Sequence, residues 1–94
     1  VNLGNAYFDA NRYEDAQKTY TEALKLKPDD PAVRTDFGLT FIMKQPADYD
    51  RAIKEFNAAL EREPNNPMAL QNLVMAWTKK GDAEKANAAI ARLE

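Results

Sequence analysis

The chain has 94 residues, of which 45% are apolar and 30% charged, with three glycines and a formal net charge of -2. This balance is typical of one folded domain and excludes disordered and collagen-like chains. The negative charge supplies no field that would attract nucleic acid or an anionic membrane. No apolar run approaches the roughly 18 residues of a membrane-spanning helix. We therefore expect neither nucleic acid nor a membrane as a partner.

Cysteine, histidine and serine are all absent. Their absence removes the commonest metal ligands, proton carriers and nucleophiles. Asp29 and Asp30 resemble an acid-base pair, but their place before a proline favours helix capping. The acidic stretch from Asp48 to Asp50 is not a calcium loop, because Ile53 stands where its glycine would be needed. We expect no catalytic residue, metal or cofactor, and hence no enzyme activity.

Apolar residues at helical spacing recur along the chain and are interrupted by short turns. Asp30-Pro31 and Asn66-Pro67 mark helix starts, because Asp or Asn caps free amides and proline fits the first turn. Another proline lies two residues before each of these starts and ends the preceding helix. The pattern predicts no strand, and it predicts six helices at about 1–10, 13–27, 31–44, 48–62, 67–80 and 83–93.

The pattern repeats three times with a period near 34 residues. Segment 3–7 reads Leu-Gly-x-x-Tyr, and segment 37–41, which begins 34 residues later, reads Phe-Gly-x-x-Phe. A second series returns 36 residues later: Ala16, Tyr20, Ala23 and Pro28 become Ala52, Phe56, Ala59 and Pro64. Pro46 and Ala47 are therefore inserted between two helices. The copies span about 1–30, 31–66 and 67–94 of a single domain, which we expect to be a piece of a longer protein.

These residues resemble the signature of the tetratricopeptide repeat, W-x2-L-G-x2-Y followed by A-x3-F and a proline. The resemblance covers the whole chain. In the first copy the leading tryptophan position falls before Val1, and in the second copy Arg34 occupies it. The third copy is degenerate, with Val74 in place of the glycine. The resemblance implies an all-α fold, a right-handed superhelical α-solenoid of three antiparallel helix pairs with a concave side.

Small and aromatic residues at the signature positions predict how the helices pack. Gly4 and Gly38, opposite Ala16 and Ala52, would let paired helices approach closely. Five aromatic residues would fill the remaining core rather than form a cofactor site: Tyr7, Tyr20, Phe41, Phe56 and Trp77. Three i,i+4 pairs are interpreted as a solvated outer face: Glu14 with Lys18, Asp50 with Lys54, and Arg51 with Glu55.

The resemblance also implies that the first helix of each pair lines a groove for a peptide or partner helix. By position, the groove residues are Val1, Asn5, Phe8 and Asp9, then Thr35, Leu39, Ile42 and Met43, then Gln71, Asn72, Met75, Thr78 and Lys79. Leu39, Ile42, Met43 and Met75 form a second apolar stripe, since the expected core residues lie elsewhere on the same helices. Such a stripe is typical of a binding surface, with packing inside the superhelix as the alternative. We expect Leu39, Ile42 and Met75 to be at least partly accessible.

Some members of this family grip the terminal carboxylate of a partner with lysine, arginine and asparagine at set groove positions. Asn5 matches the asparagine. Val1, Asp36, Met68 and Asn72 replace the other residues of that set. We therefore expect no carboxylate clamp.

The sequence favours a protein-interaction module that binds a protein or peptide in a concave, partly apolar groove. Two alternatives stay open: a structural self-association module, and a docking arm of a larger enzyme. The final helical segment carries Ala86, Ala89, Ile90 and Leu93 at helical spacing, with no later helix to cover them. We expect part of this strip to be exposed and to allow a weak homo-oligomer through the C-terminal helix.

Overall fold

A computed structural model describes residues 3–93, which form six α-helices and no strand. The helices are α1 (Leu3–Asp9), α2 (Tyr13–Leu26), α3 (Pro31–Met43), α4 (Tyr49–Arg62), α5 (Pro67–Lys80) and α6 (Ala83–Leu93). The six predicted helices are confirmed. Their ends agree with the prediction to within one residue wherever both lie in the described range.

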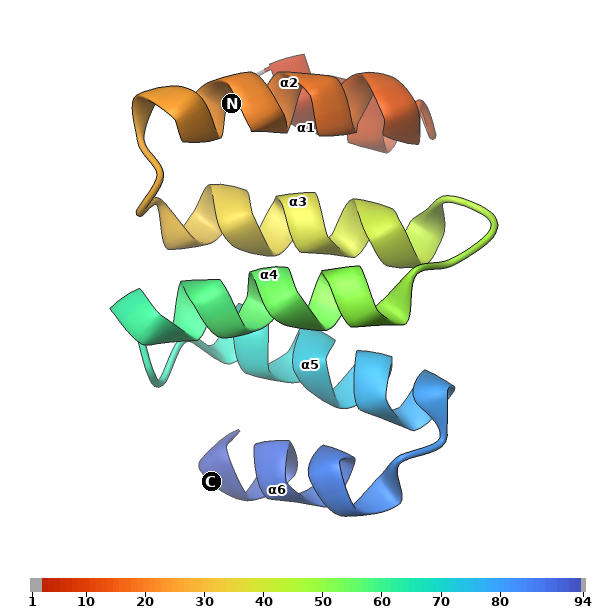
Figure 1. Cartoon of the computed structure of the whole chain (residues 1–94), viewed down its shortest axis with the longest axis vertical. Helices are drawn as coiled ribbons and strands as arrows, with labels where there is room; N and C mark the ends of the chain where they lie inside the picture. The colour runs from red at the N-terminus through yellow and green to blue at the C-terminus, as the bar shows by residue number, and fades with distance from the viewer. Residues whose placement is uncertain (1–2, 94) are drawn as a thin grey trace.

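Consecutive helices run antiparallel and stack from α1 and α2 at one end of the molecule to α6 at the other (Figure 1). Each helix packs against the next, and α3 also contacts α5 directly. The stack measures 34 × 28 × 18 Å. It is an all-α solenoid of three helix pairs, α1 with α2, α3 with α4, and α5 with α6.

The helix ends follow the capping residues that the sequence predicts. The Asp30 carboxylate accepts hydrogen bonds from the amides of Ala32 and Val33, and the Asn66 side chain accepts one from Ala69. Pro31 and Pro67 occupy the first turns of α3 and α5. The inserted residues 46–47 lie in the loop between α3 and α4, as predicted, where the Asp48 amide donates to the Phe41 carbonyl. The insertion therefore leaves both helices intact.

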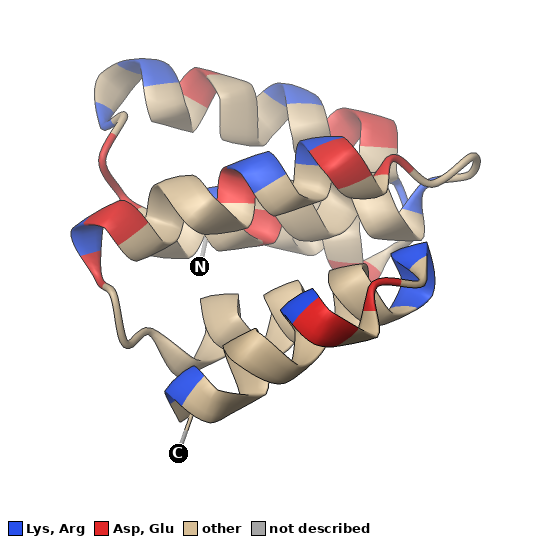
Figure 2. Cartoon of the chain, turned by 60° about the horizontal axis from the view of Figure 1, so that its bottom comes forward, with Lys and Arg blue, Asp and Glu red and all other residues tan. Residues whose placement is uncertain are grey.

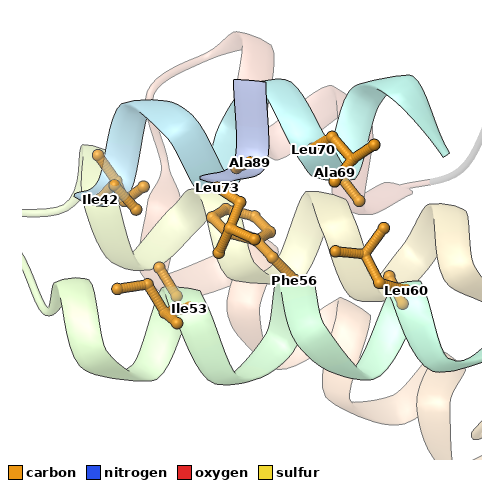
Figure 3. Packing of buried hydrophobic residues seen from close by; sticks show 11 residues of the cluster. Ile42, Ile53, Phe56, Leu60, Ala69, Leu70, Leu73 and Ala89 are labelled. Carbon is orange, nitrogen blue, oxygen red and sulfur yellow. The ribbon is translucent and has the colours of Figure 1, made fainter. Parts of the chain in front are cut away.

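The main core lies between α3, α4, α5 and α6, where Phe56 is completely buried (Figure 3). Gly38 makes this packing possible. A Cβ atom added there would lie 2.8 Å from Phe56 Cε1 and 3.1 Å from the Ala52 carbonyl oxygen. The close approach predicted for this helix pair is confirmed, because any larger residue would force the Phe56 ring to shift and press on the Ala52 backbone of α4.

A smaller core joins α2 to α3 around Tyr20 and Phe37, with Tyr7 packed against its edge. Of the five aromatic residues assigned to the core, Tyr20 and Phe56 are fully buried. Tyr7, Phe41 and Trp77 are only half-buried. Cations cover the partly open rings, with Lys85 4.6 Å from the centre of Trp77 and Arg12 4.9 Å from the centre of Tyr7.

The charged residues are interspersed along the helices rather than gathered by sign (Figure 2). Two of the three predicted i,i+4 pairs are wrong, because their acidic members form ion pairs elsewhere in the fold: Glu14 with Lys44, just after α3, and Asp50 with Lys80 on α5. Arg51 and Glu55 do pair, but Glu55 is only 3% exposed, so this pair does not lie on a solvated face. Spacing along one helix missed the partners that neighbouring helices supply.

Arg34, at the tryptophan position of the second copy, also pairs with the buried Glu55. Its Nη1 lies 2.8 Å from Glu55 Oε1, and its Nε donates to the Pro28 carbonyl. Arg51 Nε lies 3.1 Å from the other Glu55 oxygen, with its guanidinium 4.8 Å from the centre of Phe41. An ion-paired network thus joins α3 to α4 where the signature has an aromatic residue.

Candidate functional site

The first helices of the three pairs, α1, α3 and α5, supply the residues expected to line a groove. Residues three or four positions apart on a helix share a face, which groups Asn5 with Phe8 and Asp9 on α1. The same spacing joins Asp36, Leu39 and Met43 on α3. On α5 it joins Gln71 or Asn72 with Met75, Thr78 and Lys79.

A hollow of about 230 Å3 lies between α1 and α3. Its lining consists of two apolar, two acidic and two further polar side chains: Phe8, Leu39, Asp9, Asp36, Asn5 and Tyr20. The Tyr20 hydroxyl donates to Asn5 Oδ1 at 2.5 Å, and the Phe8 ring packs edge-on against Tyr13 at 5.4 Å between centres. These contacts hold α1 against α2 and fix three of the side chains that line the hollow.

The hollow is electrostatically negative. Burial, with the nearby charges of Asp36 and then Asp9, raises the pKa of Tyr20 to about 12. The pKa of Asp36 is itself raised, first by burial and then by the charge of Asp30. Both aspartates therefore act on the same buried hydroxyl, and no lysine or arginine lines the hollow.

On α3 and α5, the residues expected to line the groove are both apolar and polar. Leu39 and Met75 are half-buried, with one side packed on the main core. Met43, at the end of α3, is 43% exposed. Asn72 is half-buried, whereas Gln71, Thr78 and Lys79 are exposed.

Two residues expected to line the groove are buried. Ile42 is 5% exposed and belongs to the core between α3, α4 and α5, so the expectation that it is accessible is wrong (Figure 3). Thr35 is 3% exposed, and its hydroxyl donates to the Pro31 carbonyl. The reason is that α2, α4 and α5 all contact α3 and leave only a narrow arc of its surface open. Val1 lies outside the described residues.

Tyr20 and Asp36 line the hollow between α1 and α3 but are not among the groove residues expected from the sequence. Tyr20 was assigned only to the core, and its hydroxyl reaches the hollow from α2, which no spacing on α1 or α3 could reveal. Asp36 was noted only as a departure from the carboxylate clamp. Its place three residues before Leu39 puts it on the same helix face and could have identified it.

A larger hollow, of about 550 Å3, lies between α2 and α4 over the rings of Phe37 and Phe41. Acidic and basic side chains both line it, and three of them are ion-paired: Asp15 with Arg12, Glu14 with Lys44, and Arg51 with Glu55. The Arg51 guanidinium also covers the two rings. The hollow between α1 and α3 differs because its carboxylates have no such partners.

Two further features, a metal-binding cluster and a membrane-spanning helix, are absent from the described residues. Residues 3–93 contain no group of three or more acidic, histidine or cysteine side chains that could hold a metal ion. None of the six described helices combines the length and apolar character needed to cross a membrane.

Two family models together match almost the whole chain. One, described as TPR repeat, matches residues 4–45, and the other, described as Tetratricopeptide repeat, matches residues 45–94. The solved structure of MamA MSR-1 C2 superposes with a TM-score of 0.78 at 23% identity, over 98% of this chain and 56% of that chain. At that identity the likeness shows the fold alone.

Curated relatives align with most of this chain. Photosystem I assembly protein Ycf3 of Synechococcus sp. (strain CC9605) is 33% identical over 70 residues, which are 73% of this chain and 40% of that protein. Ycf3 of Prochlorococcus marinus (strain MIT 9211) is 31% identical over 71 residues, with the same coverage. TPR repeat-containing thioredoxin TTL4 of Arabidopsis thaliana is 28% identical over 88% of this chain and 12% of its own length. The chain thus spans less than half of each relative, and it belongs to the tetratricopeptide repeat family.

Proposed function

We propose that this chain is a protein-interaction module that holds an extended peptide or a helix of its partner along α1, α3 and α5. Tetratricopeptide repeats generally mediate contacts between proteins, which supports the general role. The Ycf3 relatives are named as assembly proteins, and we extend a role of that kind, holding a protein partner, to this chain. We propose no catalytic role for it.

One observation carries the choice of surface. Leu39 and Met75 keep part of their side chains open although both already pack on the main core. Leu39 and Phe8 line the same hollow, and Met43 is exposed one turn further along α3. Partly open apolar residues beside a hollow are typical of a surface that a partner covers. Methionine suits such a surface because its flexible side chain adapts to different apolar partners.

Selection from a random-peptide library displayed on phage tests this proposal. Enriched peptides, added to the isotope-labelled chain, should shift the amide resonances of α1, α3 and α5. Leu39→Ala and Met75→Ala should each weaken binding about fivefold, since each removes roughly 1 kcal/mol of apolar contact. Leu26→Ala is the matched control, because Leu26 is 85% exposed at the end of α2 and does not line the hollow.

The proposal fails if no peptide is enriched, or if the shifts lie on α4 or α6 instead of α1, α3 and α5. It also fails if Leu26→Ala weakens binding as much as Leu39→Ala does.

One specific observation favours a second candidate, the self-association module. Ile90 and Leu93 on α6 are 41% and 38% exposed, and Ile90 borders a hollow of about 220 Å3 between α5 and α6. A second copy could cover this end of the stack. The remaining alternative is that the chain is a docking arm of a larger enzyme. This is a proposal about the parent protein, and such an arm would bind its substrate in the same groove.

A further inference from the structure

Asp36 stands apart from the other carboxylates of the chain. Glu55 lies between two arginines, Asp15 pairs with Arg12, and Asp30 and Asp82 cap helices. Within residues 3–93, Asp36 is the one buried or half-buried carboxylate with neither a cation nor a hydrogen-bond donor. A charge that is partly withdrawn from water without a partner costs free energy, so its presence needs an explanation.

The surroundings of Asp36 fit a long cationic side chain. Asp36 and Asp9 approach the hollow from α3 and α1, and Phe8 and Leu39 supply apolar walls beside them. Lysine and arginine combine an aliphatic stem with a charged end. The stem would pack on the apolar walls, and the charged end would reach the carboxylates.

We propose that the hollow between α1 and α3 accepts a lysine or arginine side chain of a protein segment bound in the groove. The inference deepens the proposed function and rests on it, because it names the kind of residue that the partner presents. The apolar surface of Leu39 and Met75 would hold the neighbouring apolar residues of the same segment.

Charge complementarity favours this occupant over others. An acidic segment would bring a third negative charge to a site where Asp9 and Asp36 already lie together. A wholly apolar segment would cover Asp36 and leave its charge without water or partner, which costs more than leaving the site open. A basic residue is the one that lowers the cost of burying Asp36 on binding. The raised pKa of Asp36 agrees with this, because it reports how poorly the free site tolerates the negative charge.

The test uses the peptides that phage selection enriches. These should carry a lysine or arginine beside apolar residues, and the tightest arginine-containing peptide is then compared with its citrulline version, which has the same shape without the charge. We expect the arginine version to bind about tenfold more tightly, with a difference that shrinks as salt is added. Asp36→Asn should remove most of this difference, and Asp9→Asn part of it. Glu61→Gln, at an exposed position on α4, makes the same change in net charge and should leave the difference intact.

The outcomes separate the two proposals. Peptides that bind α1, α3 and α5 without any preference for a basic residue overturn this inference and leave the proposed function standing. The inference is also overturned if the arginine and citrulline peptides differ equally on the parent chain and on the Asp36→Asn variant. Absence of any groove-binding peptide overturns both.

Discussion

The two faces of α3 differ in whether their carboxylates have cationic partners. On the side that meets α4, Arg34 pairs with the buried Glu55, and Arg51 completes the network over Phe41. On the groove side, Asp36 is half-buried with no cation near it, and Leu39 is left partly open.

A contribution to folding stability explains the paired Glu55 on the α4 side, but it does not explain the unpaired Asp36 on the other side. A buried carboxylate between two guanidinium groups is compensated, whereas an isolated one raises the free energy of the folded chain. Residues that reduce stability without a compensating contact are expected where binding is the function. The contrast therefore supports the assignment of the groove face to a partner, and the changes below alter one face at a time.

The largest effect is expected on the packed face. Gly38→Val should lower the free energy of unfolding by about 2–3 kcal/mol, because the new side chain collides with the buried Phe56 ring and the Ala52 backbone. Thermal melting followed by circular dichroism measures it. Ala32→Val, at an exposed position on the same helix, is the control for placing a β-branched residue in α3 away from the contact, and it should cost less than about 1 kcal/mol. Equal melting temperatures for the two variants would show that Gly38 is not at a tight helix contact.

Glu55→Gln should have the next largest effect, a loss of about 1–2 kcal/mol. The change keeps the shape of the side chain but removes the charge that holds Arg34 and Arg51. Those arginines keep 27% and 43% of their side-chain surface exposed, so water compensates them in part. Asp50→Asn, which breaks the exposed pair with Lys80, should cost less than about 0.5 kcal/mol in chemical denaturation. A similar loss for both variants would show that the Glu55 network is no stronger than a surface ion pair.

The sequence alone predicts the architecture well and the site only in part. Helix positions follow from local signals such as Asp30-Pro31, and Gly38 follows from the repeat, so both could be found without a structure. The open arc of α3 could not, because it depends on which neighbours cover each face: Ile42 and Thr35 have groove spacing and are buried by α2, α4 and α5. Pairing between helices, as in Glu14 with Lys44, is hidden from sequence spacing for the same reason.

On the groove face, Asp36→Asn should raise stability at neutral pH, the opposite sign to the changes above. The folded-state pKa of Asp36 is raised, so the folded chain binds a proton more readily than the unfolded chain, and ionisation destabilises the fold. This penalty is complete above the raised pKa and absent below the ordinary value of 3.8. We expect a gain below about 1 kcal/mol, since a half-exposed charge is screened by water.

Melting temperatures of the parent chain and of Asp36→Asn, measured from neutral pH down to pH 3.8, test this sign. The difference should shrink as the pH falls, because Asp36 becomes protonated and then resembles asparagine. Asp9 and Tyr20 face the same hollow and Asp30 lies near Asp36, but all three are present in both chains. A variant that is less stable than the parent at neutral pH would mean that Asp36 has a stabilising partner, and it would remove the contrast between the two faces.

The smallest effect is expected at the C-terminal end, where the strip on α6 is only partly covered. As predicted, only part of the four-residue strip is exposed: Ala86 and Ala89 are buried, with α6 packed on α5, and Ile90 and Leu93 remain open. Two such side chains supply little apolar area at about 25 cal/mol per Å2, most of which the entropic cost of association offsets. We therefore expect a dimer with a dissociation constant on the order of 1 mM.

Sedimentation equilibrium should show an apparent mass that rises with concentration in the parent chain and stays at the monomer value in the Ile90→Lys, Leu93→Lys variant. Met68→Lys, which removes an exposed apolar residue from the start of α5, is the control and should behave like the parent. A parent chain that stays monomeric at millimolar concentration would exclude self-association through α6. Of the two interaction surfaces proposed for the described residues, only the groove would then remain.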